Sequence, residues 1–559
     1  MIKLSKNANI VLKRFLAKNI KGKIIETPEQ MFKRVAKNIS SIDRKYKENS
    51  KKSEKQFFEV MSNLEFLPNI PALANAGRPL QQLAACFVLP IPDDLPGIFQ
   101  AVKDMALIQK SGGGTGFSFS QLRQEGSIVG DTGGVASGPV SFMKVFDSAT
   151  GAIKEGGIRR GANMGLLRVD HPDIEKFINS KKNGEFENFN ISIAITDEFM
   201  KAVENNKTYN LIDPHTKKKV KKSARKIFNL ICENAHFNGE PGIIFIDNIN
   251  KKNPTPKEKI EATNPCGEVP LLPYESCVLG SINLSAITDK KGVNYNRLAE
   301  LVKIGVHFLD NMVDASEFPI KEIAEKVKEN RKIGLGIMGF ADCLIKQGIS
   351  YDSKAAEKQA ENIISFIQDK TKLASEELAK KRGSFPNIKN SIYKKMRNAS
   401  VTTIAPTGTI GIIADCSEGI EPLFNVIYQR FSTHGILTEF NPLFKEEARK
   451  YKLSKKELLN IAERGTVRYS KLPSEIKKIF ATAHDIKPEQ HVKIQSIFQK
   501  YTDNAVSKTV NLSEKASIND VKKTFLLAYK LKCKGLTIYR DKSREKQVLK
   551  SCKCAIPKL

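Results

Sequence analysis

Five consecutive residues near the middle of the chain contain three side chains that could do chemistry: Asn264-Pro265-Cys266-Gly267-Glu268. Side chains two residues apart point to the same side of an extended backbone. We therefore expect the Asn264 amide, the Cys266 thiol and the Glu268 carboxylate to share one face. Pro265 would stiffen this loop, and Gly267 would let its backbone approach a ligand closely. Free cysteines are often buried structural residues, but the polar groups flanking Cys266 favour a catalytic thiol.

Two further cysteines lie where they could share a pocket. Cys277 follows Cys266 by eleven residues, a spacing that suits two sulfurs in one pocket rather than a CxxC metal-binding knuckle. Cys86 lies in the apolar run 83–90, which predicts a buried strand. Nine cysteines are too few for a disulfide scaffold in 559 residues. In the cytosol such cysteines are mostly reduced, catalytic or transiently oxidised.

Three segments rich in glycine or threonine could bind anions. Segment 111–117 matches neither the P-loop nor the GxGxxG pattern, so glycines in a tight turn are the commoner explanation. Arg159 and Arg160, among the glycines of 156–165, suit either an anion-contacting loop or a solvated surface loop. The hydroxyls and backbone donors of segment 403–411 suit a phosphate group at a strand-to-helix turn. A turn without a ligand is the alternative there.

Bulk composition indicates a globular protein without a membrane segment. Hydrophobic residues make up 40% of the chain, the N-terminus has no signal-peptide pattern, and no apolar run is long enough to span a bilayer. We therefore expect a cytoplasmic protein with no membrane partner. The net charge is +30, but the lysines are scattered and no basic stretch is interleaved with aromatic residues. This pattern favours solvated lysine-rich faces over a nucleic-acid partner.

Capping residues and hydrophobic periodicity predict helices and strands along the chain. Thr27, Pro28 and Gln30 form a helix start with a capping box, within a helical and charged N-terminal region. Ser223 and Gly239 mark the two ends of another helix, and the lysine-rich run before it indicates an exposed turn or hairpin. We expect further helices over 28–37, 97–110, 297–314 and 354–381, and strands over 83–90, 242–247, 333–338 and 531–540. Alternation of this kind indicates an α/β architecture.

These segments together resemble the catalytic chain of the ribonucleotide reductases, and most closely the class II enzymes, which depend on adenosylcobalamin. The likeness runs from residue 66 to residue 549. It is densest at 85–90, 111–119, 159–171, 264–268 and 405–410, with further matches at 501–509 and 539–541. The resemblance implies an α/β fold, a ten-stranded α/β barrel of two five-stranded halves around a central finger loop. We expect a helical N-terminal region over 1–60 without an ATP-cone domain, the barrel over 61–540, and a mobile C-terminal tail over 541–559.

The resemblance implies reduction of ribonucleotides to 2′-deoxyribonucleotides by a thiyl radical. Cys266 matches the cysteine at the finger-loop tip that abstracts the 3′ hydrogen of the substrate. Glu268 matches the base that takes the 3′-hydroxyl proton, and Asn264 matches the amide that holds the substrate. Cys86 and Cys277 match the pair that delivers reducing equivalents and then closes to a disulfide. The implied cofactor is adenosylcobalamin, and no protein-ligated metal site is expected.

The resemblance also implies binding sites and partners. Substrate contacts are expected at Ile70, Ala85, Cys86, Gly114 and 264–268, and phosphate contacts at Pro406, Thr407, Gly408, Thr409 and Ile410. A deoxynucleotide effector site beside a homodimer interface is expected at Asp93, Arg123, Arg159 and Arg160. The tail pair, Cys552 and Cys554, would pass electrons from a thioredoxin-type reductant. The tail has Cys-Lys-Cys where CxxC is usual.

Other interpretations fit the sequence less well. The large subunit of a class I reductase would need a radical relay that ends in adjacent tyrosines, but Tyr539 is followed by Arg540. A class III enzyme would need a C-terminal glycyl-radical segment, and none is seen. A nucleotide-binding regulator without catalysis would not need all of residues 264–268. The sequence leaves open whether the substrate is a ribonucleoside diphosphate or triphosphate.

Overall fold

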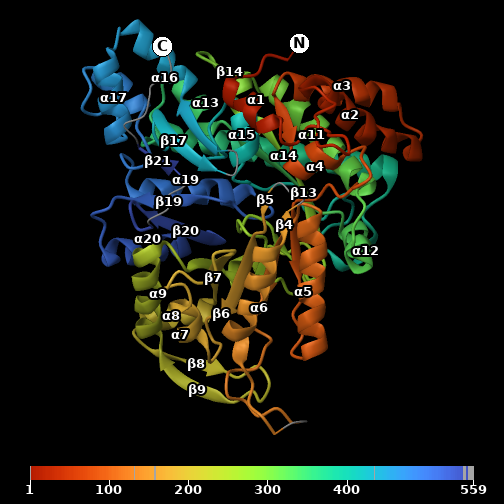
Figure 1. Cartoon of the computed structure of the whole chain (residues 1–559), viewed down its shortest axis with the longest axis vertical. Coiled ribbons are helices and arrows are strands. Elements are labelled where there is room, and N and C mark those ends of the chain that lie inside the picture. The colour runs from red at the N-terminus through yellow and green to blue at the C-terminus, as the bar shows by residue number, and fades with distance from the viewer. Residues whose placement is uncertain (1, 131–132, 156–158, 433–434, 545–548, 552–559) are drawn as a thin grey trace.

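The computed structural model describes residues 2–130, 133–155, 159–432, 435–544 and 549–551 (Figure 1). Its N-terminal part is helical, as predicted. The elements are α1 (Lys6–Leu12), α2 (Pro28–Ser40), the 3-10 helix η1 (Ser41–Tyr46), α3 (Ser50–Ser62) and α4 (Ile70–Asn75). The predicted capping box is present, because Thr27 and Gln30 each accept a backbone N–H from the other. Helices α2 and α3 pack together and against α11 (Tyr295–Ala315), which attaches this region to the rest of the molecule.

Five parallel strands form the first half of a barrel. In spatial order they are β2 (Cys86–Leu89), β3 (Gly114–Ser118), β6 (Asn163–Arg168), β7 (Phe189–Ile195) and β10 (Gly242–Phe245). Parallel neighbours need crossover connections, and helices occupy them. These are α5 (Leu95–Lys110), α6 (Gly138–Ala152), α7 (Ile174–Asn179), α8 (Asp197–Glu204) and α9 (Ala224–Asn238). Every residue of β2 and β10 is buried, as expected for strands covered on both faces.

The second half also contains five parallel segments. They are β13 (Ser276–Asn283), β16 (Ile333–Met338), segment 402–404, β19 (Thr509–Leu512) and β20 (Gly535–Arg540). Bridges from Leu335 to Thr402 and from Ile404 to Val506 place the segment between its neighbours. The two halves meet where β2 pairs antiparallel with β13 and β10 pairs antiparallel with β20. The ring is therefore closed, which confirms the predicted ten-stranded barrel of two five-stranded halves. Strand β1 (Phe66–Pro68) pairs with the outer part of β13.

Helices connect and cover this second half. They are α11, α12 (Lys321–Asn330), α13 (Phe340–Lys346), α14 (Lys354–Arg382), α15 (Gly408–Ile413), α19 (Pro488–Tyr501) and α20 (Ile518–Lys530). The largest cluster of buried apolar side chains lies between the barrel strands and the helices around them. A second cluster lies inside the barrel and contains Cys86 and Cys277.

A hairpin between β10 and β13 enters the barrel as the finger. Its strands are β11 (Ala262–Thr263) and β12 (Pro270–Leu271), and residues 264–269 join them. The hairpin runs against β3 at two glycines. A Cβ on Gly116 would lie 1.7 Å from the carbonyl oxygen of Thr263, and a Cβ on Gly114 would lie 2.9 Å from the Pro265 ring. Glycine is needed at these positions because the finger backbone occupies the space of a side chain.

Smaller elements lie outside the barrel. The hairpin β17 (Ile427–Ser432)–β18 (Gly435–Phe440) is joined by β21 (Leu549–Lys550). The lysine-rich run forms the predicted hairpin, β8 (Thr208–Ile212)–β9 (Lys219–Ser223). The remaining strands are β4 (Lys154–Glu155), β5 (Arg159–Arg160), β14 (Thr288–Asp289) and β15 (Gly292–Val293). The remaining helices are α10 (Ile246–Lys251), η2 (Leu284–Ile287), η3 (Pro386–Asn390), α16 (Pro442–Lys450), α17 (Lys455–Arg464) and α18 (Ser474–Ile479).

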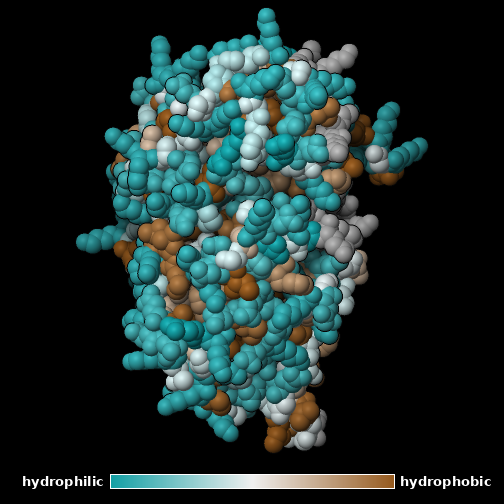
Figure 2. All heavy atoms as spheres, turned by 90° about the vertical axis from the view of Figure 1, so that its left-hand side faces the viewer, coloured by the Kyte–Doolittle hydropathy of each residue, from teal (hydrophilic) through white to brown (hydrophobic). Residues whose placement is uncertain are grey.

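The outer surface is largely polar. Hydrophilic side chains cover most of the face that carries α9, α17 and α20 (Figure 2). Among the helices that the structure describes, none is long and apolar enough to cross a membrane.

Candidate active site

The tip of the finger is a turn rather than the extended segment expected from the sequence. The carbonyl oxygen of Asn264 accepts the backbone N–H of Gly267 at 3.0 Å, and Gly267 has a φ of +80°. Asn at the first position, Pro at the second and Gly at the fourth are typical of such turns, so the sequence did contain this signal. The side chains therefore do not alternate as predicted: Asn264 and Glu268 are buried, whereas Cys266 is exposed.

Asn264 connects the finger to the barrel wall. Its side-chain amide donates to Sγ of Cys86 in β2 at 3.1 Å. Its side-chain oxygen accepts the backbone N–H of Val269 at 2.9 Å, and its own backbone N–H donates to the Val269 carbonyl at 3.2 Å. These bonds fix the Asn264 side chain beside Cys86, so an amide and a thiol expected to act together are adjacent.

Glu268 is held in a water-poor environment next to the same thiol. The residue is 2% exposed, and its Oε2 atom has no hydrogen-bond partner. Burial raises the pKa of Glu268 to about 7, and a hydrogen bond from Asn264 opposes this rise. Its backbone oxygen accepts bonds from the Thr403 hydroxyl and the Ala505 N–H, both at 2.8 Å. A carboxylate with a pKa near 7 suits a general base at neutral pH.

Cys86 and Cys277 face each other across the junction between the two barrel halves. They are directly opposite in the antiparallel pairing of β2 with β13, and both are buried as free thiols. Burial raises the pKa of each thiol, and the nearby Glu268 carboxylate raises both further. Both groups are therefore protonated at neutral pH and close enough in register to form a disulfide on oxidation. The predicted grouping of Cys86, Cys277, Asn264 and Glu268 is present in the structure.

A cavity of about 1230 Å³ opens at the exposed thiol. Pro265, Cys266 and Gly267 form part of its wall, and Pro406 is the member of the predicted phosphate turn that lines it. Hairpin β17–β18 and the start of α16 form another wall. Sequence reasoning missed residues such as Asn190, whose amide donates to the Pro265 carbonyl at 2.8 Å. Nothing in the sequence around Asn190 indicated this, because the contact depends on the position of the finger.

The other predicted substrate residues lie on several different elements. Gly408, Thr409 and Ile410 begin α15, and the Thr407 hydroxyl accepts the Gly419 N–H at 2.8 Å. Gly114 lies against Pro265, as described above. The remaining two are both partly buried: Ile70 at the start of α4 and Ala85 just before β2.

Two of the predicted effector residues are paired in the structure. Asp93 and Arg123 form an ion pair at 2.8 Å, and the Asp93 carboxylate also accepts the Arg123 backbone N–H at 3.0 Å. Arg159 and Arg160 form β5, which pairs antiparallel with β4; their side chains are outside the described part of the structure.

The predicted tail pair cannot be placed. Cys552 and Cys554 lie outside the described residues. The strand before them, β21, pairs with β17, and the Ser551 hydroxyl accepts a bond from the Asn425 amide at 3.4 Å. Asn425 and Leu549 both line the cavity, so the described end of the chain lies at the cavity wall.

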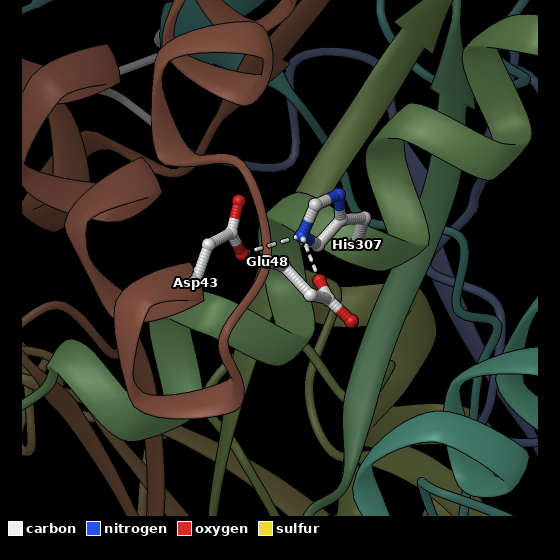
Figure 3. Close-up of side chains that lie close together, drawn as sticks. All are labelled: Asp43, Glu48 and His307. Atoms are coloured by element: carbon white, nitrogen blue, oxygen red, sulfur yellow. Dashed lines mark hydrogen bonds and ion pairs between the residues drawn. The ribbon is translucent and has the colours of Figure 1, made fainter.

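A separate group of side chains has the spacing of a metal site (Figure 3). His307 Nε2 lies 2.7 Å from Asp43 Oδ1 and 3.8 Å from Glu48 Oε2. The guanidinium of Arg382 bonds to the same two carboxylates, at 2.8 Å and 2.5 Å, and its side chain is fully buried. An arginine therefore already supplies the positive charge, and the group is an ion-pair network that joins η1 to α11 and α14.

Comparisons with known proteins agree with this geometry. The family model "Ribonucleotide reductase, barrel domain" matches residues 84–397 and 393–539, and the model "Ribonucleotide reductase, all-alpha domain" matches residues 4–81. A vitamin B12-dependent ribonucleoside-diphosphate reductase of Thermoplasma acidophilum is 46% identical, over 98% of this chain and 80% of its own length. One from Mycobacterium tuberculosis is 45% identical, over 98% of this chain and 81% of its own. The class Id ribonucleotide reductase alpha subunit of Actinobacillus ureae has a similar fold: the TM-score is 0.80, at 21% identity over 96% of this chain and 97% of that chain.

Proposed function

Because this chain belongs to the ribonucleotide reductase family, we propose that it reduces ribonucleotides to 2′-deoxyribonucleotides with adenosylcobalamin as its cofactor. The observation that carries the proposal is the finger hairpin, which brings a cysteine, a carboxylate and an opposed cysteine pair together inside the barrel. The relatives at 45% and 46% identity are named vitamin B12-dependent, whereas the class Id subunit is 21% identical. This difference favours the cobalamin enzyme over the class I alternative.

Cys266 would carry the radical that starts the reaction. Its exposure in the cavity wall suits a group that must meet both cofactor and substrate. A thiyl radical at Cys266 would abstract the 3′ hydrogen of the ribose and become a thiol again. The same thiol would return a hydrogen atom to C3′ at the end of the cycle.

Glu268 would accept a proton from the substrate, and Asn264 would hold the substrate in place. With a pKa of about 7, the Glu268 carboxylate can accept the 3′-hydroxyl proton after hydrogen abstraction. A general base positioned in this way increases the rate of a reaction by about 10²–10⁴-fold. Asn264 would keep the ribose oriented, because hydrogen bonds at both ends of its side chain fix that group.

Cys86 and Cys277 would be the reductant of the 2′ position. The 2′-hydroxyl leaves as water, the two thiols supply two electrons and two protons, and an S–S bond forms between them. The balanced reaction is ribonucleotide plus dithiol to 2′-deoxyribonucleotide, disulfide and water. Their raised pKa values support this role, because protonated thiols can donate hydrogen.

The cavity is large enough to suggest a bulky ligand. Its volume of about 1230 Å³ exceeds the roughly 300–1,000 Å³ of ordinary small-molecule sites. Apolar side chains that include Tyr428, Leu437 and Phe440 line it together with polar groups such as Asn441; they would hold the cofactor. When bound, adenosylcobalamin supplies the radical that converts the Cys266 thiol to a thiyl. The protein would exclude water and fix the distance between Cys266 and the ribose.

The substrate class proposed here is the ribonucleoside diphosphates. Both relatives above are named ribonucleoside-diphosphate reductases. The turn at Pro406–Ile410 would receive the phosphates, because Pro406 lines the cavity and the backbone N–H groups of Gly408, Thr409 and Ile410 lie in the first turn of α15. Ile70, Ala85 and Gly114 complete the proposed substrate contacts.

A deoxynucleotide effector and a second copy of the chain are the proposed regulators. Asp93 lies just before α5 and pairs with Arg123, which follows β3; helix α5 exposes Leu95 by 60% and Phe99 by 53%. Covering these apolar side chains in a homodimer would stabilise it and place the effector residues beside the interface. Arg159 and Arg160 would couple that site to the substrate base.

The C-terminal cysteines are proposed to return the buried cysteine pair to its reduced form after each turnover. Cys552 and Cys554 would reduce the Cys86–Cys277 disulfide and then be reduced by a thioredoxin-type protein. The position of β21 and Ser551 at the cavity wall supports this role, because Cys552 follows Ser551 directly. A thioredoxin-type reductant and free cysteines both suit the cytoplasm, which is the proposed location.

One incubation tests the proposed function. The protein is mixed with a ribonucleoside diphosphate and dithiothreitol, with and without adenosylcobalamin, and deoxynucleotide is measured. We expect product only with the cobalamin and without any second protein. Turnover that needs an iron- or manganese-containing partner and no cobalamin would contradict the proposal.

A further inference from the structure

The first helix of the chain lines the cavity that opens at Cys266. Ser5, Lys6, Asn7 and Ile10 all contribute to its wall, although they are more than 250 residues from the finger in the sequence. Helix α1 packs against α15, the helix that follows the proposed phosphate turn. The N-terminal region therefore forms part of the same cavity as the barrel residues.

Two polar contacts tie α1 to opposite walls of the cavity. The Asp415 carboxylate, just after α15, accepts hydrogen bonds from Ser5. On the other side, the Asn7 amide donates to the Thr438 carbonyl in β18 at 3.0 Å, and it also bonds to the Glu439 side chain. Asp415, Thr438 and Glu439 all line the cavity. Helix α1 thus joins the wall next to the phosphate turn to the wall made by hairpin β17–β18.

The Asn7 contact falls on an otherwise unsupported edge of the hairpin. In the sheet of described strands the order is β18-β17-β21, so β18 has a strand neighbour on one side only. An edge strand presents backbone groups that its own sheet does not pair. The Asn7 amide satisfies one of them at Thr438, and this bond holds the edge of β18 to the N-terminal region.

Charged groups continue this link toward the phosphate turn. Glu439 Oε1 lies 3.7 Å from Arg430 Nε, and the Arg430 guanidinium pairs with Glu418 at 2.5 Å. The Glu418 carboxylate lies 3.8 Å from where a Cβ on Gly408 would be. A shift of β18 would therefore move Glu439 and disturb the ion pairs that reach the turn at Gly408.

We propose that Asn7 is a positioning residue of the ligand cavity, fixing hairpin β17–β18 relative to the turn at Pro406–Ile410. The inference rests on the proposed function, because the ligands of this cavity are taken to be the cobalamin cofactor and the nucleotide. Holding the wall in its binding shape before the ligand arrives lowers the ordering cost of binding. Loss of Asn7 should therefore weaken binding more than it weakens the fold.

The test compares two asparagines of the same helix in the full-length protein. Asn7→Ala removes the bond to β18. Asn9→Ala is the matched control: within the described part of the chain, the Asn9 amide donates only to the nearby Leu4 and Ser5 carbonyls, and Asn9 does not line the cavity. The dissociation constant for adenosylcobalamin is measured by equilibrium dialysis, together with KM for a ribonucleoside diphosphate, kcat and Tm.

We expect Asn7→Ala to weaken cobalamin binding or raise the nucleotide KM by about two- to tenfold, the range expected for one lost hydrogen bond. Its Tm should match that of Asn9→Ala, and Asn7→Gln should recover part of the affinity. If the two alanine variants bind both ligands equally, or differ only in Tm, the inference is wrong. If the unaltered protein binds no adenosylcobalamin, the proposed function fails, and this inference fails with it.

Discussion

The side-chain amide of Asn264 donates to Sγ of Cys86 at 3.1 Å, across 178 positions of sequence. This bond joins the tip of the finger to the first strand of the barrel, at the point where Cys86 faces Cys277. It keeps the reducing pair next to the residues proposed to bind the ribose. The reaction therefore depends on where the finger lies as well as on which residues it contains.

The three cysteines of the site should fail in different ways when replaced by serine. Cys266→Ser should abolish 3′ hydrogen abstraction, because an alcohol O–H is a much poorer radical site than a thiol. Cys86→Ser and Cys277→Ser should allow abstraction but block reduction at the 2′ position, and release of free base is expected. Exchange of a 3′ tritium label and release of base distinguish these outcomes. Tritium exchange by Cys266→Ser would refute the assigned radical position.

Glu268 should set the pH dependence of the reaction. Its base form must be ionised, so kcat/KM should rise with pH through about 7 and fall about tenfold per pH unit below that value. Glu268→Gln should lower kcat by about 10²–10⁴-fold and remove this limb. A pH–rate profile from pH 5 to 9 measures both effects. An unchanged acidic limb in Glu268→Gln would mean that another group titrates.

The same carboxyl group should make the fold less stable as pH rises. Its pKa is about 7 in the folded protein against 4.5 for the ordinary group, because burial disfavours the charged form. Between these values the folded state binds a proton that the unfolded state has lost. The free energy of unfolding should therefore fall as pH rises from about 4.5 to 7. Glu268→Gln should flatten this part of a denaturant-based stability profile.

Gly116 should be intolerant of a side chain. In Gly116→Ala the new Cβ would lie 1.7 Å from the Thr263 carbonyl oxygen, so the finger would have to move. We expect a loss of about 1–3 kcal/mol of stability and a fall in kcat. Gly130→Ala is the control, because nothing lies within 4 Å of its Cβ position. Equal Tm and kcat values in the two variants would contradict the close packing of finger and β3.

Deoxynucleotide effectors should change which base is reduced without switching the enzyme off. The prediction rests on the ion pair of Asp93 with Arg123 as the proposed effector site. In a competition assay with mixed ribonucleotides, added deoxynucleotides should alter the product ratio, and Asp93→Asn should weaken that response. Complete inhibition of all four substrates by dATP would contradict an effector site that changes only the preferred base.

The tail cysteines should be needed for repeated turnover only. A Cys552→Ser, Cys554→Ser double variant should complete its first turnover, because Cys86 and Cys277 begin reduced. Steady-state turnover with a thioredoxin-type reductant should be lost, while a small dithiol that reaches the cavity should restore it. Product per active site in single-turnover and steady-state assays measures this. Loss of the first turnover, or full thioredoxin-driven rate, would exclude a shuttle role.

The sequence by itself determined the residue types of the site and most of the local structure. The capping box at Thr27, the strand at Ile333–Met338 and the hairpin at the lysine-rich run depend on neighbours in the chain, and the structure confirms them. The barrel followed from resemblance, because periodicity alone indicates only alternating helices and strands. Residues 264–268 contain a tight turn, which suits their residue types, whereas the two-residue spacing of the polar side chains predicts an extended segment.

Only the tertiary structure decided which distant groups meet. The glycines of segment 111–117 indicate a tight turn in the sequence. In the structure, position 116 requires glycine because the finger backbone occupies the space of a side chain. The pKa of Glu268 depends on burial by strands far along the chain. The contact of Asn7 with β18 spans 431 positions. Such contacts arise from the closure of the barrel, and no local pattern specifies them because their energy depends on packing between remote segments.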